Sequence, residues 1–185
     1  MITYVALLRG INVGGHKLIK MADLVRIFSS MGFSNVRTYI VSGNVLFETR
    51  ETKPEVLIRE IEIGLHKALG YEVGVILRTI AEFEALVKLD PFKKRKADAD
   101  VKKYVTFLSQ KHQSKFKVPV LSPKKDWEII HLTPREVFVV GFPVQGRYGE
   151  SMSLIEKEFG KSVTTRNWNT VLKILALGQK SSEQG

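Results

Sequence analysis

The stretch ALLRGINVGGHKLIKM, residues 6–21, places glycines among cationic and amide side chains directly after an apolar run. Gly10 and Gly15 have the glycine spacing of a Walker phosphate loop. However, His16 stands where that loop requires lysine, and Leu18 stands near the place of its magnesium-binding Ser or Thr. The G-x-G-x-x-G pattern of dinucleotide-binding loops is absent as well. The stretch therefore predicts neither a Walker ATPase nor a dinucleotide-binding loop.

A turn that glycine permits can still point backbone N–H groups at an anion. The residues that would surround such an anion are Arg9, Asn12, Gly14, Gly15, His16 and Lys17. A plain connection between a strand and a helix, in which the glycines adopt positive φ, explains the same residues. The sequence leaves both interpretations open.

A second polar stretch, SGN at residues 42–44, contributes Ser42 and Asn44 as candidate ligand contacts. Gly and Asn tolerate the left-handed conformations of a tight turn, and apolar alternation flanks them on both sides. The sequence favours a turn between two strands here, with ligand binding as the alternative.

The third stretch, VTTRNWNTV at residues 163–171, has the densest set of polar donors. Thr165 or Asn167 can cap the helix that follows, which places Arg166, Asn167 and Asn169 around its positive end. Anions bind at such ends, but an ordinary helix cap explains the same residues. Trp168 shares helical spacing with the apolar residues after it, so we expect it in the core rather than stacked on a base.

Catalytic and metal-binding patterns are otherwise sparse. The four histidines are His16, His66, His112 and His131, and none pairs with another at the i, i+4 spacing of metal ligands. There is no cysteine, and neither H-E-x-x-H nor G-x-S-x-G occurs. No metal site is predicted, the cofactor stays unknown, and only His16 has neighbours suited to acid–base catalysis. Whether the protein is an enzyme stays open.

The net charge of +10 is unevenly distributed along the 185 residues. Residues 1–90 carry 11 Lys and Arg against 10 Asp and Glu, whereas residues 91–185 carry 18 against 9. Such a field attracts polyanions, so nucleic acid or a phosphorylated small molecule is a plausible partner. A surface tuned for solubility explains the same charge.

No apolar stretch approaches the ~20 residues of a membrane span, and the first residues lack the pattern of a signal peptide. The absence of cysteine agrees with a reducing compartment. We therefore expect a cytoplasmic protein without membrane contact.

The elements that must position these motifs follow from periodicity. The first half predicts a strand at 3–8, a helix from Leu24 to Gly32, two strands around the 42–44 turn, a helix from Pro54 to Gly70, and a strand at 72–77. This order is that of a ferredoxin-like βαββαβ module.

The second half repeats this order less regularly. A helix near 80–89 and a charged connector precede the strand at 103–109 and the hairpin at 127–142. The stretch between them, which contains Pro119 and Pro123, is where the first helix of a second module would fall. Ser153 and Glu156 have the spacing of a capping box for a short helix that ends at Gly160, and a last helix runs from Trp168 to a stop at Gly178. We therefore predict an α+β protein with two ferredoxin-like modules in tandem, at 1–78 and 103–185, joined by 79–102, with an extra C-terminal helix.

The stretches ALLRGINVGGHKLIKM, GFSNVRTYIVSGNVLFET and TTRNWNTVLKILAL together closely resemble the bacterial domain-of-unknown-function family 1697. The resemblance runs over almost the whole chain and implies a two-part α+β protein, without an established activity. It also implies that the recurring polar residues of the family correspond to Arg9, Asn12, Gly14, Gly15, Ser42, Gly43, Asn44, Arg166, Asn167, Trp168 and Asn169. The segment GRYGESMSLIEKEFG departs from the family pattern, because Met152 or Leu154 stands where a lysine is expected.

Three hypotheses for function follow. The first is an anion-binding protein for nucleic acid or a phosphorylated ligand, and the second is an enzyme for a small phosphorylated or carboxylated substrate at a site between the two modules. The third is an interaction domain without a small ligand. The first two predict that Arg9, Asn12 and His16 lie near Arg166 and Asn167.

Overall fold

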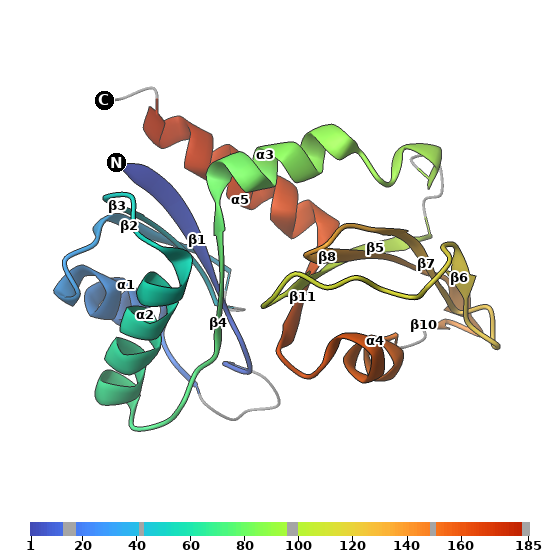
Figure 1. The fold of residues 1–185 in the computed structure, drawn as a ribbon, viewed down its shortest axis with the longest axis horizontal. Helices are drawn as coiled ribbons and strands as arrows, with labels where there is room; N and C mark the ends of the chain where they lie inside the picture. The colour runs from blue at the N-terminus through green and yellow to red at the C-terminus, as the bar shows by residue number, and fades with distance from the viewer. Residues whose placement is uncertain (13–17, 41–42, 96–99, 149–150, 183–185) are drawn as a thin grey trace. The chain divides into compact units, whose positions relative to one another are not determined.

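The computed structural model describes residues 1–12, 18–40, 43–95, 100–148 and 151–182 (Figure 1). These residues form five α-helices and two larger antiparallel sheets, which confirms the predicted α+β class. The chain divides into two compact units. Unit 1 consists of Met1–Glu84 and Ile174–Gly185, and unit 2 consists of Ala85–Lys173.

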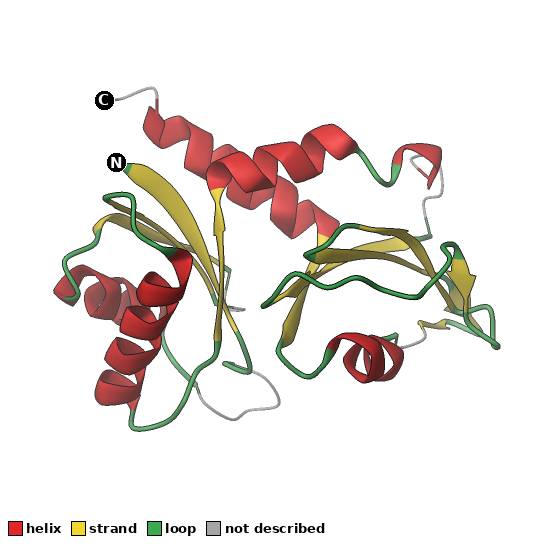
Figure 2. Ribbon diagram, in the orientation of Figure 1, coloured by secondary structure: helices red, strands yellow, loops and turns green. Residues whose placement is uncertain are grey.

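Unit 1 contains a four-stranded sheet with two helices on one face (Figure 2). Its elements follow one another as β1 (Ile2–Leu8), α1 (Met21–Ser30), β2 (Ser34–Tyr39), β3 (Asn44–Thr49), α2 (Pro54–Leu69) and β4 (Val75–Thr79). The strand order across the sheet is β2-β3-β1-β4, and every described pairing is antiparallel. The predicted sequence of strand, helix, strand, strand, helix and strand is present in this unit.

Local signals explain why the helices of unit 1 begin and end where they do. Pro54 opens α2, where its missing N–H costs nothing. Gly70 ends the helix in the left-handed conformation with φ 77° and donates to the carbonyl of His66. Leu57, Ile61 and Leu65 lie on one buried face of α2. They pack against every second residue of β1, namely Tyr4, Ala6 and Leu8. Burial of this apolar face holds α2 on the sheet.

Unit 2 is built on a five-stranded sheet with the order β11-β5-β8-β7-β6. Its strands are β5 (Lys102–Leu108), β6 (Val120–Leu121), β7 (Trp127–Leu132), β8 (Glu136–Gly141) and β11 (Val163–Asn167). The short helix α4 (Met152–Phe159) packs on this sheet through Ile155. A small hairpin of β9 (Pro143–Val144) and β10 (Arg147–Tyr148) and the 3-10 helix η1 (Lys93–Arg95) complete the unit.

The stretch expected to hold the first helix of a second module is not helical. Residues 109–119 have no helix and no strand, and they run from β5 to β6. From Lys111 to Lys117 the side chains alternate between exposed and half-buried. Side-chain exposure that alternates at every second residue is typical of an extended chain lying on a protein surface. The segment is therefore extended where a helix was predicted.

Gly178 does not end the last helix, contrary to the prediction. The helix α5 runs from Trp168 to Ser182 and continues through Gly178. A Cβ atom at Gly178 would lie 2.2 Å from Cδ1 of Ile80, the first residue of α3 (Ile80–Leu89). The glycine therefore permits a close helix contact, which local sequence signals do not reveal.

The predicted capping box of α4 is displaced as well. The helix begins at Met152, so Ser153 lies inside its first turn and Ser151 occupies the cap position. Gly160 follows the last helical residue, as predicted.

Candidate functional site

Two of the three polar motifs meet in unit 1, at the end of β1. The N–H of Leu8 donates to the carbonyl of Gly43 at 2.8 Å, and the N–H of Arg9 donates to the carbonyl of Gly74 at 2.9 Å. The opening motif is therefore held between the β2–β3 turn on one side and the residues before β4 on the other. The third motif belongs to unit 2.

Gly43 is required at this meeting point for two reasons. Its φ of 75° is a conformation that side chains rarely adopt. In addition, a Cβ atom there would lie 2.7 Å from Cδ1 of Ile11 and 2.9 Å from Cβ of Leu8. Gly43 thus packs directly on the side chains of Leu8, the last residue of β1, and of Ile11.

The two described amide side chains of these motifs hold backbone turns. Asn12 accepts from the N–H of Ile19 at 2.8 Å and donates to its carbonyl at 3.1 Å, which holds these two residues together. Asn44 is fully buried and donates to the carbonyl of Tyr39 at 2.9 Å. These contacts favour the structural interpretation of both residues. The remaining predicted contacts of the two motifs, Gly14, Gly15, His16, Lys17 and Ser42, lie outside the described residues.

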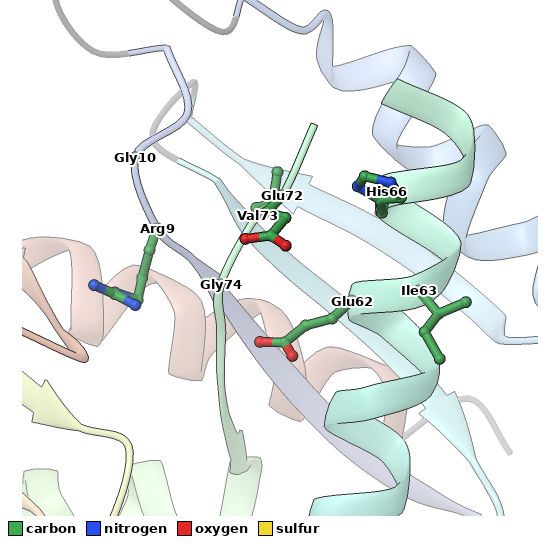
Figure 3. A pocket seen from close by; sticks show the side chains of 8 residues that line it. All are labelled: Arg9, Gly10, Glu62, Ile63, His66, Glu72, Val73 and Gly74. Atoms are coloured by element: carbon green, nitrogen blue, oxygen red, sulfur yellow. The ribbon is translucent and has the colours of Figure 1, made fainter. Parts of the chain in front are cut away.

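A groove of about 740 Å³ runs beside Arg9 at the start of β4 (Figure 3). Glu62, His66 and Glu72 line it together with Arg9. Figure 3 shows that the guanidinium of Arg9 points away from Glu62 and His66. Glu62 accepts from the N–H of Val75 at 3.0 Å, so it also fixes α2 against β4.

The groove offers two carboxylates, one imidazole and one guanidinium, and these do not converge on a common point. Two carboxylates disfavour an anionic ligand in the same space. The described residues contain no group of three or more His, Cys, Asp or Glu side chains that could hold a metal ion. Glu62 and His66 were not predicted as groove residues, although their i, i+4 spacing puts them on one face of a predicted helix.

Arg166 in the third motif is a buried residue of β11. Its side chain is 7% exposed, and its Nη1 donates to Oγ1 of Thr164 at 2.8 Å and to the carbonyl of Thr165 at 2.9 Å. Burial lowers the pKa of Arg166 to about 10, because removal from water disfavours the charged form. Arg166 is thus a buried residue whose guanidinium hydrogen-bonds its own strand, and its part in ligand binding stays a prediction.

The other residues of this motif organise the start of α5. Oδ1 of Asn167 accepts from the N–H of Asn169 at 2.9 Å, which is the contact of a helix cap. Asn167 and Asn169 are both exposed. The ring of Trp168 lies 5.1 Å from that of Phe92 and 6.4 Å from that of Phe138, so the prediction of a core tryptophan is confirmed.

The segment of residues 109–119, which we call the basic segment, is fixed to α4 by one carboxylate. Glu158 accepts from Oγ of Ser114 at 3.1 Å and from the N–H of Lys115 at 3.3 Å. Nε2 of His112 lies 3.8 Å from the same carboxylate. The inward side chains of the segment therefore bind α4, and its lysines point outward.

A small polar pocket of about 270 Å³ lies where the basic segment leaves β5. Its polar lining comes from Ser109, Gln110, Lys111, His112, Lys161 and Ser162. Local patterns could not predict that these residues meet, since they come from two stretches about 50 residues apart. The sequence QKHQSKFK is polar except for Phe116, so it gave no periodic signal of an extended, half-buried segment.

Comparisons with known proteins place the chain next to uncharacterised relatives. The model of a family described as "Protein of unknown function (DUF1697)" matches residues 1–138. Among solved structures, the conserved bacterial protein SP0830 from Streptococcus pneumoniae is similar with a TM-score of 0.67 and 22% identity. That match covers 95% of this chain and 97% of the other. At this identity the likeness concerns the fold alone. None of the curated proteins matches the chain.

Proposed function

Because the chain belongs to the DUF1697 family, which has no assigned function, we propose from its own residues that it binds polyanions, with nucleic acid as the partner. The observation that carries this proposal is the distribution of charge between the two units. Unit 2 contains 18 Lys and Arg against 9 Asp and Glu, whereas unit 1 contains 11 against 10. A net charge of this size on one compact unit raises the local concentration of polyanions.

The exposure of the lysines supports the same proposal. Lys111, Lys115 and Lys117 of the basic segment are exposed. Within the described residues, no carboxylate lies within ion-pair distance of these three ammonium groups. Their charge is therefore directed at solvent, where phosphates can displace counterions. The groove beside Arg9 favours an anion less, because Glu62 and Glu72 line it.

Fluorescence anisotropy on the full chain tests this function. The probes are a single-stranded and a duplex DNA of 20 nucleotides, each labelled at one end, at 50 mM and 200 mM salt. If three lysines contact phosphates of a single strand, affinity falls about 20-fold over this fourfold change in salt. Absence of binding to both probes at 50 mM salt contradicts the proposal.

Competition with heparin separates nucleic acid from polyanions in general. We expect a single-stranded DNA to displace the labelled probe at a lower charge concentration than heparin does. Equal displacement by both would show a binding surface for polyanions without preference for nucleic acid.

Two structural proposals accompany this function. We retain two ferredoxin-like modules in tandem, supported by strand order: β11, β5, β8 and β7 follow one another in unit 2 as β4, β1, β3 and β2 do in unit 1. We also retain a cytoplasmic location, supported by the absence of cysteine. Among the described residues, the helices are too short or too polar to cross a membrane.

A further inference from the structure

We infer that the small polar pocket between the basic segment and the end of α4 is a phosphate-binding subsite. This inference rests on the proposed function and names the chemical group that unit 2 recognises. The pocket lies wholly in unit 2, between residues 108–112 and residues 159–162.

The polar part of the pocket lining contains hydrogen-bond donors suited to an anion, beside the apolar Leu108 and Phe159. Lys111 and Lys161 supply ammonium groups, His112 supplies an imidazole, and Ser109 and Ser162 supply hydroxyls. No carboxylate belongs to the described lining, although that of Glu158 on α4 lies 3.8 Å from Nε2 of His112. Charge-assisted hydrogen bonds from ammonium groups to phosphate oxygens are short and strong, so this donor set selects an anion over a neutral ligand.

The backbone around the pocket is fixed before any ligand arrives. The N–H of Ser109 donates to the carbonyl of Ser162 at 3.1 Å, and the N–H of His112 donates to the carbonyl of Pro134 at 2.7 Å. The imidazole of His112 packs edge-on against Phe159 with 4.9 Å between the ring centroids. The backbone and the imidazole therefore lose little conformational freedom when an anion binds, whereas the two exposed lysine side chains must still be ordered.

The volume of the pocket limits the size of the group that enters it. At about 270 Å³ it falls just below the range of sites that enclose a drug-sized ligand. A phosphate group with part of a sugar fits this space better than a whole dinucleotide. We therefore assign the pocket to a terminal phosphate rather than to a base.

Beyond the pocket, the basic segment offers further lysines that can bind the rest of a single-stranded nucleic acid. Lys115 and Lys117 follow Lys111 on the exposed side of the segment. In an extended chain, residues two apart on one side are separated by about 7 Å. A single-stranded nucleic acid whose first phosphate occupies the pocket can thus place later phosphates beside these lysines.

The test compares two single-stranded oligonucleotides of the same sequence, one with a 5′-phosphate and one with a 5′-hydroxyl, both labelled at the 3′ end. Anisotropy is measured at 50 mM salt on the full chain and on two double variants. K111Q/K161Q removes both ammonium groups of the pocket, and K124Q/K125Q removes two exposed lysines from the turn before β7. Thermal denaturation of each variant checks the fold, and K111Q alone is a milder second variant.

We expect the wild-type chain to bind the 5′-phosphate about tenfold more tightly, as one charge-assisted hydrogen bond provides. This preference should disappear in K111Q/K161Q, decrease in K111Q and persist in K124Q/K125Q. Equal binding of the two oligonucleotides by the wild-type chain, or an unchanged preference in K111Q/K161Q, overturns the inference. In either case, salt-dependent binding would leave the proposed function standing.

A second measurement uses inorganic phosphate as the probe and does not depend on nucleic-acid binding. The melting temperature of each protein is compared in 20 mM phosphate and in chloride of equal ionic strength. Phosphate should raise the melting temperature of the wild-type chain and of K124Q/K125Q, but not the melting temperature of K111Q/K161Q. If this occurs while neither oligonucleotide binds, the pocket is a site for a small phosphorylated molecule and the proposed function fails. If phosphate has no effect and neither oligonucleotide binds, both proposals fail.

Discussion

At the scale of single residues, the amide side chains of the polar motifs are used to hold the backbone. Asn12 bridges the two ends of a loop, Asn44 closes the β2–β3 turn, and Asn167 caps α5. Sequence reasoning could not decide between this role and ligand binding, because an amide beside a glycine turn is typical of both. The decision required the partners of each amide group, which only the structure supplies.

The first prediction at this scale concerns Gly43. Gly43→Ala should lower the free energy of unfolding by about 2–4 kcal/mol, since it adds left-handed strain and forces Cβ against Ile11 and Leu8. Chemical denaturation of the purified chain measures the loss. The matched control is Gly10→Ala, where φ is 66° but no atom lies within 4 Å of the added Cβ. The control should lose only about 1–2 kcal/mol. Equal losses would show that packing against β1 contributes nothing.

At the scale of elements, the sequence predicted those helices and strands that carry their own signals. Pro54 and Gly70 bound α2, and the hairpin of β7 and β8 follows from apolar alternation around a turn. The presence of Gly178 inside α5 could not be predicted, because the glycine makes room for Ile80, about 100 residues away in the sequence. The same holds for the basic segment, whose conformation depends on Glu158 of α4.

We therefore predict that Glu158 controls the order of the basic segment. Glu158→Ala removes the acceptor of Ser114 Oγ and of the Lys115 N–H, and it should cost about 1–2 kcal/mol of stability. Hydrogen exchange measured by mass spectrometry should show amides of residues 113–117 exchanging about tenfold faster, while the strands of unit 2 keep their protection.

Glu156→Ala is the control for this prediction. Glu156 lies on the same helix and has the same charge, and its carboxylate accepts no hydrogen bond from the described residues. Its removal should leave exchange in the basic segment unchanged. Equal acceleration in both variants would mean that helix stability, rather than the Glu158 contacts, orders the segment.

At the scale of the whole molecule, counting charges along the sequence located the basicity in the second half, and the structure assigns it to unit 2. The surface that presents it could not be predicted. Lys111 and Lys161 are far apart in the sequence and line one pocket only because β5 and β11 pair as neighbours. The net charge of the unit can thus be predicted from the sequence, whereas the position of the pocket depends on the strand order of the sheet.

Unit 1 is assembled from two distant ranges of the chain, which leads to the last prediction. Val5, Leu7 and Ile76 are buried although they face away from α1 and α2, so another part of the chain must cover that side of the sheet. Residues from Ile174 onward belong to unit 1, where the carbonyl of Leu177 accepts from Arg37 and Gln179 donates to Glu84.

A chain truncated after Lys173 should therefore lose protection of β1 and β4 in hydrogen exchange and bind an apolar dye. A chain that ends at Ser182 is the control and should retain both strands. Unchanged protection in the truncated chain would show that the sheet of unit 1 folds without α5.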